Sequence, residues 1–175
     1  MAKSLKENGI GTNVDHTDIM GVLNEKGWGY GRSYEASRTV AANAVSTNSD
    51  LQYIFDLHRD SARKETTTKE IDGESYAKIL FVVGAEYASY EKNLAIATEL
   101  HTLIDAKYPG LSRAVITKEG PGNNGIYNQD LLENSLLIEF GGVDNTLDEL
   151  YRTADAVADV FSEFYWNAEK VNANP

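Results

Sequence analysis

Two residues of this sequence, His58 and Glu139, combine reactive side chains with positions where apolar strands are expected to end. His58 directly follows the apolar stretch 51–57, and Glu139 lies inside the apolar stretch 136–140. An ionised glutamate is costly to bury, so Glu139 needs either a partner or a chemical function. Beside a metal-bound water, a desolvated carboxylate suits a general base, and His58 is the histidine best placed to hold zinc.

Both residues also have a structural explanation, which the sequence leaves open. His58 could be an ordinary histidine at a sheet edge, hydrogen-bonded to Asp56 or Asp60. Glu139 could instead form a structural ion pair with an arginine. The arginines considered as its partner are Arg38, Arg63 and Arg113.

The other polar residues are not predicted to take part in the reaction itself. His16 falls in a polar stretch and His101 lies beside the apolar stripe of a predicted helix, so both are interpreted as structural. Arg63 is predicted to orient acidic groups of a substrate, although arginines after a strand commonly pair with neighbouring acids. The stretch 119–125 is rich in glycine and asparagine, and we predict that the loop 121–128, which ends at Asn128, contacts a substrate.

Composition limits the function classes. The formal charge of −11 argues against a nucleic-acid partner and against an anionic membrane surface, because both require clustered Lys and Arg. The 175 residues contain no cysteine, which excludes thiolate zinc clusters, thiol nucleophiles and disulfides. No apolar run is long enough to span a bilayer, so the chain as given is expected to be soluble. Its length predicts a single domain over residues 1–175.

The elements that must position these residues alternate between strand and helix. Asp72 and Gly73 provide the positive φ angles of a type I′ turn, which predicts a β-hairpin between the stretches 66–71 and 75–83. Thr146 and Glu149 form a capping box at the start of the last helix. Further strands are predicted at 51–57, 113–117 and 135–140, and further helices at 18–27, 33–45 and 89–108.

This order predicts an α/β fold with a mixed, mostly parallel central sheet, helices on both faces and one β-hairpin. Sites in such sheets lie beyond the carboxyl ends of the strands. His58 and Glu139 are both predicted near such ends, so parallel neighbouring strands would bring them together.

Four segments carry a joint pattern: YIFDLHRDS at 53–61, YPGLSR at 108–113, YNQD at 127–130 and LIEFGGVDNT at 137–146. Taken together, they resemble the stage II sporulation protein P family of endospore-forming bacteria. The resemblance extends over nearly the whole chain.

The resemblance implies a zinc-dependent N-acetylmuramoyl-L-alanine amidase, which cuts peptidoglycan between muramic acid and the stem peptide during engulfment. It implies that His58 is a zinc ligand and that Glu139 activates the metal-bound water. It also implies a lytic transglycosylase and a membrane protein as partners. The intact protein is expected to be anchored at the sporulation septum, facing the cell wall.

The family pattern also has an earlier core strand and a segment with further zinc ligands, and this sequence does not match them. We therefore expect the chain to begin inside the catalytic domain, with Glu35 or His16 as poor substitutes for the other ligands. A catalytically incomplete fragment that binds the wall or a partner is the alternative. A different zinc hydrolase, such as a carboxypeptidase, is a third reading.

Overall fold

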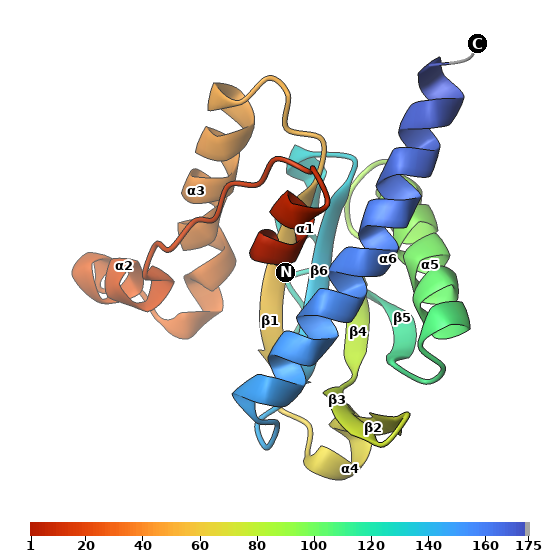
Figure 1. Cartoon of the computed structure of the whole chain (residues 1–175). Coiled ribbons are helices and arrows are strands. Elements are labelled where there is room, and N and C mark those ends of the chain that lie inside the picture. Colours follow the sequence, from red (N-terminus) through yellow and green to blue (C-terminus); the bar gives the residue numbers. More distant parts are fainter. Residues whose placement is uncertain (174–175) are drawn as a thin grey trace.

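The computed structural model describes residues 1–173 and is built around a four-stranded sheet in the order β1-β6-β4-β5 (Figure 1). β1 pairs with β6 and β4 with β5 in parallel, whereas β4 and β6 are antiparallel. The predicted α/β fold with a mixed, mostly parallel sheet is therefore confirmed. The strands are β1 (Ile54–Asp60), β4 (Ile79–Gly84), β5 (Ser112–Lys118) and β6 (Ser135–Gly142).

Helices α1, α5 and α6 lie over one face of this sheet, and α2 and α3 stand beside β1 (Figure 1). None of the helices within residues 1–173 is both long and apolar enough to cross a membrane. The helices are α1 (Ala2–Glu7), α2 (Ile19–Lys26), α3 (Ser33–Thr47), α4 (Lys64–Thr67), α5 (Tyr90–Lys107) and α6 (Leu147–Ala173), with short 3₁₀ turns η1 (Tyr30–Arg32) and η2 (Gln129–Leu131).

The hydrophobic core lies between the sheet and helices α5 and α6. Ile138 and Phe140 of β6 belong to it, together with Phe81 of β4 and Phe161 of α6. Successive side chains of a strand point to opposite faces. Glu139, between Ile138 and Phe140, therefore points away from the core.

The predicted hairpin forms, but its second strand is shorter than expected. β2 (Thr68–Ile71) and β3 (Glu74–Ala77) are antiparallel, and Asp72 and Gly73 take the predicted positive φ angles of 51° and 80°. The stretch 75–83 is not one strand, because Lys78 separates β3 from β4. The Lys78 N–H donates to Thr67 O, whereas its carbonyl accepts from Gly141 N, so the chain changes sheet at this residue.

The last strand is longer than predicted. It continues through Gly141 and Gly142, because β1 extends far enough for Asp60 to pair with Gly142. The predicted capping box then starts α6, with Thr146 N donating to Glu149 Oε2 at 2.8 Å and Glu149 N donating to Thr146 Oγ1 at 3.2 Å. The end of β6 and the start of α6 are thus fixed relative to each other.

Candidate functional site

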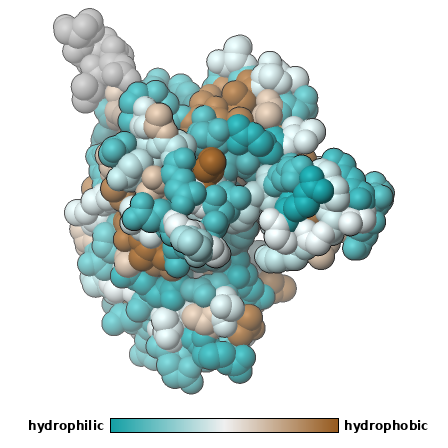
Figure 2. All heavy atoms as spheres, turned by 180° about the vertical axis from the view of Figure 1, so that it is seen from behind, coloured by the Kyte–Doolittle hydropathy of each residue, from teal (hydrophilic) through white to brown (hydrophobic). Residues whose placement is uncertain are grey.

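His58 and Glu139 are paired neighbours on the parallel strands β1 and β6. Residues paired in this way project from the same face of a sheet. That face is opposite the one that α6 covers, so the two side chains lie on the side of the sheet turned away from the core. The back of the molecule, seen in Figure 2, is mostly hydrophilic with separate apolar areas.

Glu139 has a buried carboxylate oxygen without a hydrogen-bond partner in the described part of the chain. Its side chain is partly buried, and its Oε2 has no hydrogen-bond partner among the residues that the structure describes. Burial raises the pKa of Glu139, and the negative charges of Asp60 and Asp56 raise it further, against the opposing effects of His58 and Arg113. A carboxyl with raised proton affinity and a free oxygen is the form that a general base requires.

His58 is held by two neighbours. Its Nε2 lies 2.9 Å from Asp56 Oδ1, which is one of the two structural partners that the sequence left open. This hydrogen bond raises the pKa of His58, although burial opposes the shift. The ring of Tyr34 stacks on the imidazole, with centroids 6.1 Å apart and an interplanar angle of 17°. The imidazole is therefore oriented before any ligand arrives.

Within the described residues, each arginine considered as a partner of Glu139 pairs with a different acid. Arg38 binds Asp130 through two hydrogen bonds of 2.8 and 2.7 Å. Arg63 Nε lies 3.1 Å from Asp144 Oδ2, and the Arg63 side chain is 71% exposed. Arg113 contacts Asp60. The structural explanation of Glu139 as half of an ion pair therefore has no support in these contacts.

The loop between β5 and η2 is fastened to α3 through Asn128. Tyr127 and Asn128 both have positive φ angles, 53° and 58°, which residues other than glycine seldom adopt. The Asn128 side-chain amide donates to Tyr34 O at 2.9 Å and to Ser37 Oγ at 3.0 Å. The predicted substrate-binding role of Asn128 stays a prediction, and the structure adds a second role, which is to hold Tyr34 in place.

Tyr34 and Tyr127 are two site residues that the sequence analysis missed. Their rings meet edge to face with centroids 5.0 Å apart, beside His58. Burial raises the pKa of Tyr34, and the charges of Asp56 and Glu139 contribute to the same shift. Tyr127 belongs to the segment 127–130 that carried the family resemblance, but nothing in the sequence connected Tyr34 to His58.

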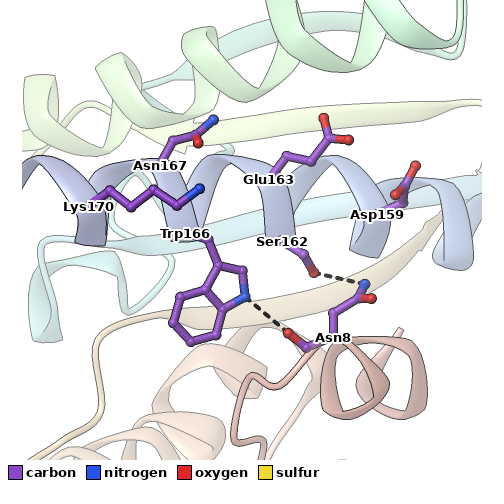
Figure 3. Close-up of a pocket in the computed structure, with 7 residues that line it drawn as sticks. All are labelled: Asn8, Asp159, Ser162, Glu163, Trp166, Asn167 and Lys170. Carbon is purple, nitrogen blue, oxygen red and sulfur yellow. Dashed lines mark hydrogen bonds between the residues drawn. The ribbon is translucent and has the colours of Figure 1, made fainter.

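A cavity of about 500 Å³ lies between α1 and α6 (Figure 3). The Trp166 indole N–H donates to Asn8 O at 3.0 Å, and the Asn8 amide donates to Ser162 Oγ at 3.1 Å. These bonds fasten α1 to α6. The cavity contains neither His58 nor Glu139, so we assign it a structural role.

Comparison with known proteins shows the family. The family model described as Stage II sporulation protein P matches residues 1–162. The chain belongs to this family. It is 57% identical over 171 residues to Stage II sporulation protein P of Bacillus subtilis (strain 168), and the match covers 98% of this chain and 43% of that protein. The chain thus spans less than half the length of this relative, and no solved structure matches it.

The family resemblance implies zinc, but the described residues do not make a three-ligand zinc site. Residues 1–173 contain no group of three or more His, Cys, Asp or Glu side chains placed to hold a metal ion. Glu35 Oε2 accepts a hydrogen bond from Arg32 Nε at 2.7 Å, and His101 Nδ1 lies 2.7 Å from Ser112 Oγ. His16 lies in the exposed segment before α2. Neither Glu35 nor the other two histidines joins His58.

Proposed function

We propose that this sporulation protein is part of a peptidoglycan amidase that cleaves the amide between N-acetylmuramic acid and L-alanine, with Glu139 as general base. The observation that carries the proposal is the free Oε2 of Glu139, partly buried and next to the oriented imidazole of His58. An unsatisfied buried carboxylate oxygen costs about 1–3 kcal/mol. A reaction that uses this oxygen as a proton acceptor explains why the cost is kept.

In this reaction a water molecule attacks the carbonyl carbon of the amide. Glu139 takes one proton from the water as the new C–O bond forms. The C–N bond then breaks, and Glu139 returns the proton to the leaving amine nitrogen. Hydrolysis uses one water per bond and leaves Glu139 ionised, ready for the next cycle.

Zinc binding is part of this proposal, although the described residues do not form a three-ligand site. We propose that His58 is one ligand of a site that also needs donors outside the described residues, since none of those residues supplies a second and third ligand beside it. The Asp56 hydrogen bond at Nε2 would either orient the ring for metal binding through Nδ1 or have to break.

A second candidate function is a fragment that binds the wall or a partner without catalysis. It needs no metal site, and residues 1–173 contain no group of three or more possible metal ligands. It gives no reason, however, for an unpaired carboxylate on the open face of the sheet. A zinc hydrolase with another target bond, such as a carboxypeptidase, differs only in its products.

Engulfment, a lytic transglycosylase partner, a membrane-protein partner and a septal membrane anchor remain proposals for the whole protein. They rest on the family resemblance and on the sporulation role in the family's description. The net charge of −11 supports a wall or protein partner over nucleic acid.

The experiment that tests the proposal compares the chain with its Glu139→Gln variant on purified peptidoglycan. Released peptides and glycan ends are identified by mass spectrometry, which separates amidase from carboxypeptidase products. We expect Glu139→Gln to lower kcat by at least about 100-fold, because a positioned general base contributes about 10²–10⁴-fold. Sedimentation with the wall provides the second readout. Wall binding without any product, unchanged by Glu139→Gln, would establish the binding fragment instead.

A further inference from the structure

We propose that Arg113 is a further catalytic residue, whose guanidinium Nε–H stabilises the negative charge on the carbonyl oxygen of the amide. This inference rests on the proposed function, because it concerns the same reaction at Glu139. It assigns Arg113 a direct contact with substrate, beyond its ion pair with Asp60.

The position of Arg113 follows from the strand order. It lies on β5, one outer strand of the sheet, and its Nη2 contacts Asp60 Oδ2 on β1, the other outer strand. Strands β4 and β6 lie between them, and Leu80 of β4 is the residue paired with Glu139 of β6. The ion pair thus spans β4 and β6, and β6 is the strand that carries Glu139. The electrostatic effect of Arg113 on Glu139 agrees with this closeness.

The burial of Arg113 makes its unused donor informative. Its side chain is 13% exposed and that of Asp60 is 20% exposed. The Asp60 contact uses Nη2, but the buried Nε has no hydrogen-bond partner among the residues that the structure describes. A buried donor without a partner costs about 1–3 kcal/mol. Arg113 therefore carries a free donor where Glu139 carries a free acceptor.

This donor and acceptor match the transition state of amide hydrolysis. When the water oxygen bonds to the carbonyl carbon, the C=O electron pair moves onto the carbonyl oxygen, which becomes negative. Arg113 Nε–H then donates to that oxygen while Glu139 holds the proton taken from the water. When the C–N bond breaks, the carbonyl forms again and the proton passes to the nitrogen. A fixed donor in a water-poor site contributes about 10²–10³ in rate.

Asp60 has the role of a positioning residue. By accepting from Nη2, and by accepting from Ala62 N at 2.9 Å, it fixes the guanidinium plane and leaves Nε available. The competing explanation is structural, with Arg113 serving only to neutralise Asp60. The two explanations differ for a variant that removes both charges.

The test measures binding to the chain by calorimetry, with a chelator present so that no metal contributes. The first probe is a phosphonate analogue of an N-acylated alanine peptide, in which a tetrahedral, negatively charged P–O group replaces the scissile carbonyl. The second probe is the matching uncleaved amide. We expect the phosphonate to bind more tightly than the amide, and Arg113→Lys to weaken the phosphonate at least 10-fold while changing the amide by less than about threefold.

Two further variants keep the test decisive. The double variant Asp60→Asn with Arg113→Met removes both charges without leaving either unpaired, and we expect its phosphonate affinity to stay low. Arg152→Lys is the control, because Arg152 forms a more exposed ion pair with Glu74 at 2.9 Å on another part of the fold, with side chains 32% and 62% exposed. Thermal denaturation of every variant shows whether it is folded.

The inference is overturned if the double variant recovers wild-type phosphonate affinity, if Arg113→Lys weakens both probes alike, or if the wild-type chain does not prefer the phosphonate. The proposed function fails separately, when Glu139→Gln leaves peptidoglycan hydrolysis unchanged. Because the binding test needs no turnover, one result does not decide the other.

Discussion

Two chemically identical substitutions, Glu139→Gln and Glu149→Gln, are expected to change stability in opposite directions. Glu139 has a carboxylate oxygen without a partner, whereas Glu149 accepts from Ser75 Oγ at 2.6 Å and from Thr146 N at 2.8 Å. Replacing Glu139 removes a charge that the fold does not satisfy. Replacing Glu149 removes a charge on which several donors converge.

The magnitudes follow from these contacts. Because Glu139 is only partly buried and still attracts His58 and Arg113, we expect Glu139→Gln to stabilise the fold by about 1 kcal/mol, at the low end of the cost of an unpaired buried group. For a chain of 175 residues this corresponds to a Tm about 2–4 °C higher. Glu149→Gln should destabilise it by about 1–3 kcal/mol.

The stability contributions of Glu139 and Glu149 change with pH in opposite directions. Burial raises the folded-state pKa of Glu139, so the ionised group costs stability above that pKa and the cost disappears as pH falls. Burial raises the pKa of Glu149, but the hydrogen bonds from Ser75, Thr146 and Asn145 lower it by more. The result is a pKa of about 2 for Glu149. Its stabilisation is therefore present above the unfolded pKa and is lost as pH falls toward 2.

The assay is urea denaturation followed by circular dichroism at pH 7 and again at lower pH, on wild type and both variants. We expect the gain from Glu139→Gln to be largest at pH 7 and to shrink on acidification. If Glu139→Gln destabilised the fold at pH 7, or its effect did not vary with pH, Glu139 would have a satisfied, structural carboxylate and the argument for a general base would be wrong.

Three further predictions concern the metal, the loop and the sheet. After stripping and reloading, this chain should hold less than one zinc, and His58→Ala should remove what remains, as measured by metal analysis; a full equivalent in both proteins would place the ligands elsewhere. Asn128→Ala should destabilise the fold by about 1–3 kcal/mol in urea denaturation, because it loses the two bonds that the amide donates to α3 and the bond that it accepts from Arg38 Nη1, and keeps a φ of 58°, whereas Asn128→Gly should lose less. Gly142→Ala should prevent stable folding, because its Cβ would lie 2.0 Å from Ala62 O, whereas Gly29→Ala, with nothing within 4 Å, should melt near the wild-type temperature; equal melting temperatures would contradict the close approach.

Local sequence patterns determined most of the secondary structure. Two features depend only on residues a few positions apart and could be predicted from the sequence. They are the turn at Asp72 and Gly73 and the capping box of Thr146 and Glu149. The boundary between β3 and β4 at Lys78 could not be predicted from the sequence, because it arises where the backbone N–H and C=O of this one residue bond to different parts of the fold. Likewise, the continuation of β6 to Gly142 depends on the pairing strand.

For the candidate site, the sequence alone identified His58 and Glu139 as residues with reactive side chains at strand positions, and the alternation of strands and helices placed them near one edge. Which residues surround them was decided only by tertiary structure. Arg113 reaches Asp60 because of the strand order, and Tyr34 stacks on His58 because α3 stands beside β1. Such contacts join residues far apart in the chain, and no local periodicity encodes them.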